Sequence, residues 1–162
     1  MKKISILFLF ILSACSFCNA QTTLKGFTKL VYHSSYCFGS CPKIDMQIDS
    51  KRNIYVYRDS DAETAKLNGA SAKGYFKGVL DVKTYNRLLK TLLKSKYNRQ
   101  QWPDVTCCDA VVTTIIVYVN NKRTYLRSMT PPKQANELID LLFDIGLQTP
   151  LQPTNEKKEL EE

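Results

Sequence analysis

One stretch in the first half of the chain alternates regularly between apolar and polar residues. Ile44, Met46 and Ile48 alternate with polar residues, and this period of two predicts a half-buried β-strand. Residues 50–53 are turn formers that precede another β-rich stretch, so the two stretches predict a hairpin. We expect four strands in this part of the chain: 27–33, 44–49, 54–57 and 75–79.

Two later segments repeat their apolar residues every three or four positions. In 82–97 the apolar residues share one face and the basic residues the other, which predicts an amphipathic helix with Asp81 as its N-cap. A second helix is predicted to begin at Thr130, with Pro131 in its first turn, and to end at Gly146.

The most apolar segment, 111–119, predicts a strand that is covered on both faces, because apolar residues occupy both sets of alternating positions. A compact Asn120-Asn121 turn then leads into a strand over 123–127. Since most of the links are short hairpins, we predict an α+β fold. It is expected to be a single domain with a largely antiparallel sheet of about five to six strands and two helices packed on one face.

Composition divides the chain into three parts. Residues 1–20 hold two lysines, an apolar run and small residues, which is typical of a signal peptide, and the run is too short to span a bilayer. Residues 21–148 predict one α+β domain. Residues 149–162 contain two prolines, few apolar residues and alternating charges, so we predict a disordered C-terminal tail.

Two routes of cleavage fit the signal peptide. Residues 18–20 (CNA) resemble a signal peptidase site, whereas residues 12–15 (LSAC) resemble a lipobox, in which Cys15 becomes the lipidated N-terminus. Cleavage after Ala20 leaves four cysteines, an even number that suits an oxidising compartment. We expect an exported protein, either periplasmic or secreted or an outer-membrane lipoprotein, with no transmembrane helix in the mature chain.

The charge of the chain points to anionic partners. Its formal net charge is +8, and a basic surface attracts anionic molecules. Because an exported protein rarely meets nucleic acid, we expect no such partner. The sequence leaves the partner unknown: an envelope protein, a glycan and an anionic lipid surface are the candidates, and the net charge also serves solubility alone.

Four cysteines follow the signal peptide: Cys37, Cys41, Cys107 and Cys108. In an oxidising compartment they predict structural disulfides. Two pairings stay open: Cys37 and Cys41 each bond one member of the vicinal pair, or Cys37 bonds Cys41 locally. The vicinal pair does not fit zinc-ligand spacing, and the three-residue spacer between Cys37 and Cys41 does not fit a thiol–disulfide oxidoreductase. We therefore predict no metal and no cofactor.

Few other residues form a catalytic pattern. His33 is the only histidine, and a Cys–His dyad is conceivable. Asp104 and Asp109 flank the vicinal cysteines and could form a general acid–base pair. The sequence contains no nucleophile elbow, P-loop or dinucleotide-binding fingerprint.

The segment Cys37-Phe38-Gly39-Ser40-Cys41-Pro42, followed by an alternating strand, resembles the C-[FY]-G-[ST]-C-P signature of an uncharacterised bacterial domain-of-unknown-function family. Its members look like small exported or lipid-anchored proteins. The resemblance covers roughly residues 27–147 and favours a local Cys37–Cys41 disulfide as the shared feature, but it implies no reaction. The candidate functional loop consists of Phe38, Gly39, Ser40, Pro42 and Asp109.

These patterns lead to two main functional hypotheses, and a third is an inhibitor-like domain that presents the Cys37–Cys41 loop to a partner protein. The first is an exported envelope protein that acts as a non-enzymatic binding or structural module stabilised by disulfides. The alternative is a thiol-dependent or acid/base enzyme that acts through the Cys37/Cys41 loop together with Asp109.

Overall fold

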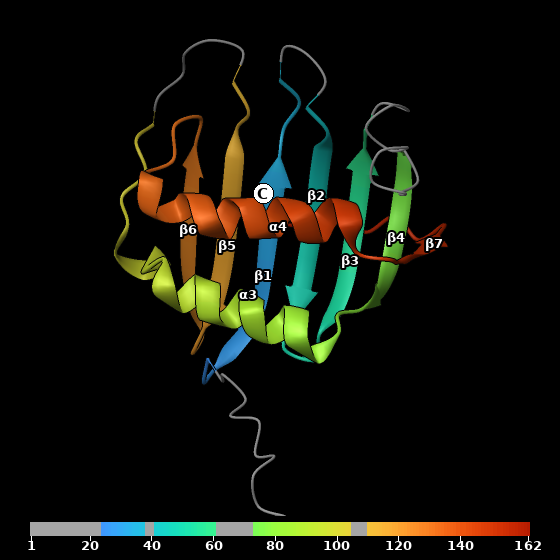
Figure 1. The fold of residues 1–162 in the computed structure, drawn as a ribbon, viewed down its shortest axis with the longest axis horizontal. Coiled ribbons are helices and arrows are strands. Elements are labelled where there is room, and N and C mark those ends of the chain that lie inside the picture. Colours follow the sequence, from blue (N-terminus) through green and yellow to red (C-terminus); the bar gives the residue numbers. More distant parts are fainter. Residues whose placement is uncertain (1–23, 38–40, 61–72, 105–109) are drawn as a thin grey trace, which may run out of the picture.

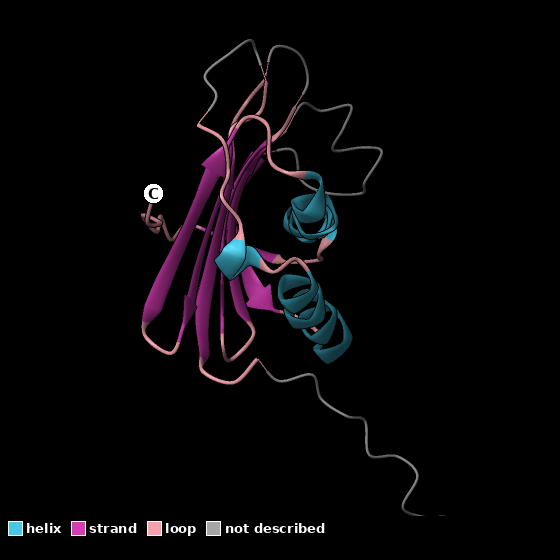
Figure 2. Ribbon diagram, turned by 90° about the vertical axis from the view of Figure 1, so that its left-hand side faces the viewer, coloured by secondary structure: helices cyan, strands magenta, loops and turns pink. Residues whose placement is uncertain are grey.

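The computed structural model describes residues 24–37, 41–60, 73–104 and 110–162. Within them, seven strands form one sheet in the order β6-β5-β1-β2-β3-β4-β7, and every neighbouring pair is antiparallel. Two α-helices lie along one face of this sheet (Figures 1 and 2). This architecture confirms the predicted α+β class, with seven strands instead of about five to six.

The strands are β1 (Phe27–Ser34), β2 (Lys43–Asp49), β3 (Asn53–Asp59), β4 (Lys73–Val79), β5 (Thr113–Val119), β6 (Lys122–Ser128) and β7 (Gln152–Thr154). The helices are α3 (Val82–Lys94) and α4 (Asn136–Gln148), together with the 3₁₀ helices η1 (Tyr97–Arg99) and η2 (Lys133–Ala135).

Alternation along the strands places most of the apolar residues on the face that the helices cover, here called the inner face. Ile44, Met46 and Ile48 of β2 are fully buried there, as the period of two predicted. Leu88 and Leu92 of α3 belong to the same core. Burying an aliphatic side chain of this size stabilises a fold by about 1.5–3 kcal/mol. The core therefore lies between sheet and helices, and the outer face of the sheet carries different chemistry.

The strand predicted over 111–119 is β5, which begins at Thr113 and lies between β1 and β6. Ile116, on the outer face, is as fully buried as its inner-face neighbours, so both faces of this strand are covered as predicted. The turn that follows contains Asn120 and Asn121 at φ 50° and 61°, the left-handed conformation that asparagine tolerates.

Helix α3 begins as predicted but ends earlier. Asp81 is the N-cap, because its Oδ1 accepts a hydrogen bond of 2.9 Å from the Thr84 amide. The helix ends at Lys94 instead of continuing to residue 97. Lys96 adopts a left-handed conformation (φ 53°), which interrupts the helical geometry before η1.

Both predicted ends of the second helix are wrong. Thr130 and Pro131 precede it, since a second proline follows Pro131 and disfavours helical geometry there, and α4 begins only at Asn136. Gly146 lies inside the helix instead of ending it. A Cβ atom at Gly146 would lie 2.8 Å from Cγ2 of Ile44, so glycine allows the close packing of α4 on β2.

One arginine lies within the inner face and joins α4 to β3. Arg58 is only 3% exposed, and its Nη1 donates hydrogen bonds to the carbonyl oxygens of Leu147 at 2.6 Å and Gly146 at 3.3 Å. Its guanidinium also lies 4.1 Å from the centre of the Phe76 ring. The arginine therefore satisfies carbonyl groups that the end of a helix leaves without partners.

The largest difference from the prediction concerns residues 149–162, here called the strap. Instead of a disordered tail, the strap forms β7, which pairs with β4, and then crosses the outer face of the sheet. Figure 2 shows the C-terminus on the side of the sheet opposite the helices. The polar composition of the strap is misleading because its partners are polar groups of the sheet and not the core.

Candidate functional site

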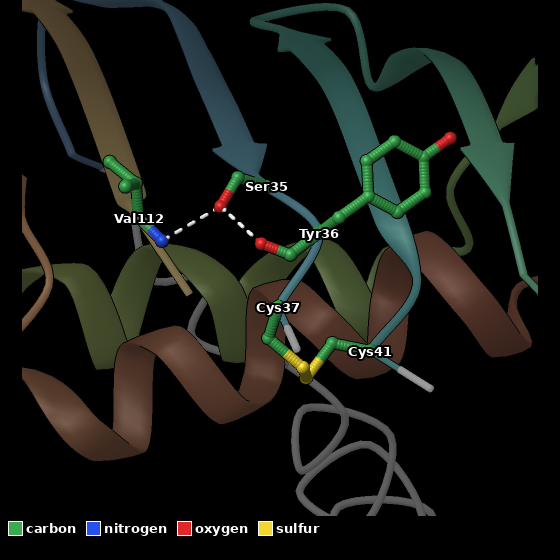
Figure 3. The surroundings of a disulfide bond; sticks show 5 residues. All are labelled: Ser35, Tyr36, Cys37, Cys41 and Val112. Carbon is green, nitrogen blue, oxygen red and sulfur yellow. Dashed lines mark hydrogen bonds between the residues drawn. A yellow bond between two sulfur atoms is a disulfide. The ribbon is translucent and has the colours of Figure 1, made fainter. Parts of the chain in front are cut away.

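The predicted functional loop is held by a disulfide. Cys37 and Cys41 are bonded to each other, with their Cα atoms 5.4 Å apart (Figure 3). This is the local pairing, so neither residue bonds Cys107 or Cys108, and neither offers a free thiol. Pro42 is buried directly after the disulfide.

The remaining predicted site residues lie outside the described part of the chain: Cys15, Phe38, Gly39, Ser40, Cys107, Cys108 and Asp109. The acid–base pair of Asp104 with Asp109 therefore stays a prediction. Among the described residues, no three His, Cys, Asp or Glu side chains come together as metal ligands.

The residues that precede the disulfide are fixed to the start of β5. The Ser35 hydroxyl accepts a hydrogen bond of 2.9 Å from the Val112 amide and donates one of 2.8 Å to the Tyr36 carbonyl (Figure 3). The Ser35 amide donates in turn to the Val112 carbonyl at 3.1 Å. These contacts fix Ser35 to the residue before β5, and they bring no nucleophile and base together.

The most concentrated chemistry lies on the outer face of the sheet. Because alternate residues of neighbouring strands share this face, rows of basic and aromatic side chains run across it. The strap lies over these rows. The outer-face set consists of Lys29, His33, Lys43, Tyr55, Tyr57, Tyr75, Tyr118, Arg123, Tyr125 and Arg127.

Glu161 of the strap is held by three side chains from three adjacent strands, here called the glutamate clamp. The Tyr118 hydroxyl lies 2.6 Å and 2.9 Å from the two carboxylate oxygens, Lys29 Nζ donates at 2.9 Å, and Arg123 Nε donates at 2.7 Å. The hydrogen bond from Tyr118, with those from Lys29 and Arg123, outweighs burial and lowers the pKa of Glu161 to about 2. The clamp therefore holds an ionised carboxylate.

The register of the sheet assembles this clamp. Lys29 of β1 lies opposite Tyr118 of β5, and Tyr118 lies opposite Arg123 of β6. Lys29 Nζ also lies 4.5 Å from the centre of the Tyr118 ring. The strand register thus places the three side chains on one face at the same level, independently of the strap.

His33 contacts the same strap residue through its backbone. Its Nδ1 lies 2.8 Å from Oδ1 of Asp45 on β2, and its Nε2 lies 2.7 Å from the carbonyl oxygen of Glu161. Burial disfavours the imidazolium, but the hydrogen bonds to Asp45 and to Glu161 outweigh it and raise the pKa of His33. In the same pair, bonds from His33 and Lys43 outweigh burial and lower the pKa of Asp45.

A tyrosine holds the middle of the strap. The Tyr55 hydroxyl donates to the Glu156 carbonyl at 2.7 Å and accepts a hydrogen bond of 2.8 Å from the Lys158 amide. Lys77 forms an ion pair of 3.2 Å with the Glu156 carboxylate, but both groups are more than half exposed, so this pair adds little. Recognition at this point depends on the strap backbone.

Two hollows flank the His33–Asp45 pair. One of about 280 Å³ is lined by Thr114, Tyr125 and Arg127, and the end of the strap borders it. The other, of about 560 Å³, lies over three tyrosines of β3 and β4 and is bordered by strap residues 158–160. The outer face is therefore not filled completely by the strap.

Parts of this face can be seen in the sequence, but nothing local connects them. Basic residues lie on one side of the predicted strand 123–127, His33 is the only histidine, and the end of the chain is acidic. The acidic end could have been matched to that basic strand by charge. No local pattern shows that His33 lies opposite Asp45, because that neighbour depends on the register of two strands.

Comparisons with known proteins give no family assignment. No protein-family model matches the sequence, and no curated protein matches it either. The resemblance of residues 37–42 to the uncharacterised family therefore stays a prediction. The helices in the described part of the chain are too short or too polar to cross a membrane.

Proposed function

We propose that this protein is an exported, non-enzymatic binding module of the bacterial envelope, and that its ligand is an acidic polypeptide segment held in extended form on the outer face of the sheet. The signal peptide predicted over 1–20 supports export. The observation that carries the proposal is the glutamate clamp, which already holds a segment of this kind.

The strap shows how such a ligand would be recognised. Lys29, Tyr118 and Arg123 together give a carboxylate four close contacts of 2.6–2.9 Å, which selects an acidic side chain. Tyr55 and His33 contact backbone groups of the strap, which any polypeptide possesses. The site therefore requires a carboxylate at one position and tolerates different residues elsewhere.

Charge favours an acidic ligand over a neutral one. If the strap leaves, Lys29 and Arg123 lose the carboxylate that both contact. Arg127, four residues from Arg123 along β6, adds a further positive charge to the same face and forms no ion pair with any described residue. An incoming carboxylate restores the lost charge pairing at no rearrangement of the strands.

The test is a competition between the strap and a peptide of the same sequence. A fluorescent peptide of residues 155–162 (NEKKELEE) is titrated into the full-length E161K variant, in which the introduced ammonium group is repelled by the clamp cations. We expect fluorescence polarisation to show that the peptide binds to E161K. A peptide in which glutamine replaces the clamped glutamate should bind more weakly. E159K makes the same charge change at an exposed strap position outside the clamp and should bind less peptide than E161K.

A second variant locates the site. R123Q in the E161K background should reduce peptide binding, whereas K122Q, which removes a neighbouring exposed charge of β6, should not. Equal losses from the two substitutions would show attraction to net charge alone and would contradict a specific clamp. The Cys37–Cys41 disulfide leaves neither residue the free thiol that a thiol-dependent enzyme would need, and Asp109 of the acid/base alternative lies outside the described residues.

A further inference from the structure

We propose that the strap is an autoinhibitory occupant of the outer face and that a proton on His33 latches it, so that loss of this proton opens the face to an acidic segment of a partner protein. The inference rests on the proposed function, because it names the regulation of the same site. It is carried by the two contacts of the His33 ring, by the charges around that ring and by the way the strap is attached.

The two ring contacts require a doubly protonated imidazole. Asp45 is an ionised carboxylate, and the Glu161 carbonyl oxygen can only accept, so both ring nitrogens of His33 must donate. A neutral imidazole has one N–H group. It would keep the hydrogen bond to the Asp45 carboxylate, because bonds to an ionised acceptor are stronger. The lone pair of Nε2 would then face the lone pairs of the Glu161 carbonyl at 2.7 Å, which expels the strap.

The charged groups around His33 belong to β2, β6 and the strap, whose Lys158 also borders the adjacent hollow. Asp45 and Glu162 favour the imidazolium, and Glu159 borders the adjacent hollow. Lys43, 3.3 Å from the Asp45 carboxylate, and Arg127, across the smaller hollow, oppose it. The cross-strand neighbours Thr114 of β5 and Tyr57 of β3, which lies beyond Asp45, complete the surroundings.

This balance favours the charged ring while the strap is bound. Burial lowers the pKa of His33, but the hydrogen bonds to Asp45 and the Glu161 carbonyl raise it above its ordinary 6.5. A raised value means that the stabilisation is complete at low pH and is lost as the pH rises through the value of the bound state. The strap is therefore closed in mild acid and opens toward alkaline pH.

Because the strap is attached at several points, only its last residues, around Glu161, are released when His33 loses its proton. Glu161 is bound at two points: the glutamate clamp contacts its side chain, and His33 contacts its backbone carbonyl. β7 pairs with β4 independently of both contacts. Release at Glu161 therefore uncovers the clamp while the strap stays tethered, and a partner segment must compete with a tethered occupant.

The full-length chain allows a direct test, because His33 is the only histidine and its ring signals in an NMR spectrum need no assignment. The ring resonances and the backbone amides of residues 159–162 are followed from about pH 5 to about pH 9. We expect one common midpoint above the ordinary histidine value. The NEKKELEE peptide would lose the same His33 contact as the strap, so access is measured with a carboxylate probe, dye-labelled 4-aminobutyrate, which offers the clamp a carboxylate but no backbone carbonyl to Nε2. Its affinity should rise about tenfold across the same range.

Two variants separate the latch from a general effect of pH. H33Q places a neutral amide that donates at every pH, so the strap amides and the affinity for the carboxylate probe should lose their pH dependence. D45N removes the charge that favours the imidazolium and should move the common midpoint to lower pH. Circular dichroism spectra identical to that of the wild type confirm that both variants fold.

The outcomes distinguish the two proposals. Strap amides that do not follow the His33 titration overturn the latch, even if E161K binds the peptide. Strap amides that follow it, in a protein whose E161K variant binds no peptide, confirm the latch and overturn the binding function. Affinity for the carboxylate probe that is independent of pH in the wild type, with peptide binding to E161K intact, overturns the claim that the latch controls access.

Discussion

Glu161 and His33 respond to pH in opposite directions, and together they bound the range in which the strap is attached. The clamp lowers the pKa of Glu161 from 4.5 to about 2, so its contribution is present above 4.5 and is lost as the pH falls through about 2. The contribution of His33 is present at low pH and is lost as the pH rises through its raised pKa. The strap is therefore expected to be held most firmly in mild acid.

The lower limit of this range is a prediction for a single residue. At about pH 3.5, where a free glutamate is mostly protonated, the amides of residues 159–162 should still show the restricted motion that a heteronuclear NOE reports. E161Q, which keeps the shape and loses the charge, should show mobile amides at this pH and at neutral pH. Loosening of the wild-type strap with a midpoint near 4.5 would contradict the clamp geometry.

At the scale of elements, the approach of α4 to β2 depends on one glycine. A methyl group at position 146 would lie 2.8 Å from Cγ2 of Ile44, closer than packed carbon atoms allow. We expect Gly146→Ala to destabilise the protein by about 1–3 kcal/mol through overpacking, although alanine favours helix formation. Urea denaturation followed by circular dichroism measures this loss.

A double variant and a control test the cause of that loss. Ile44→Ala removes the clashing methyl group, so the additional cost of Gly146→Ala should fall in that background. Gln148→Ala changes an exposed residue of the same helix and should alter stability by less than about 0.5 kcal/mol. A cost of Gly146→Ala that is unchanged by Ile44→Ala would contradict the proposed contact.

The elements that the sequence predicts well are those with local causes. The alternation of Ile44, Met46 and Ile48 and the cap at Asp81 depend on residues within a few positions of each other. The prediction of a helix end at Gly146 is wrong because the neighbour that requires glycine there, Ile44, is distant in sequence. For the same reason the sequence points to the loop after Cys37 as the candidate site, whereas the clamp joins three strands and the strap.

At the scale of the molecule, the strap combines a part that belongs to the fold with a part that behaves as a ligand. Leu151 packs against the core, and β7 extends the sheet, whereas residues 155–162 contact mainly polar side chains. Partly exposed ion pairs contribute about 0–1 kcal/mol each, whereas a buried leucine contributes about 1.5–3 kcal/mol. The two parts should therefore differ in their effect on stability.

Two truncations test this division. Removal of residues 155–162 should leave cooperative unfolding and cost less than about 2 kcal/mol, because it removes only surface contacts. Removal of residues 149–162 also removes Leu151 and β7 and should cost distinctly more. Equal losses in urea denaturation would show that the last eight residues belong to the fold as much as β7 does.

The pairing of β7 with β4 also bears on self-association. An uncovered edge strand offers a row of amide and carbonyl groups on which another chain can add a strand, which is a route to aggregation. β7 covers the β4 edge, and Pro153 within it has no amide hydrogen to offer to a further strand. The opposite edge, β6, carries Lys122, Arg123 and Arg127, whose like charges repel a second copy. Because ligand exchange at the clamp leaves β7 in place, the protein can expose its binding surface without uncovering the edge of β4 to its own copies.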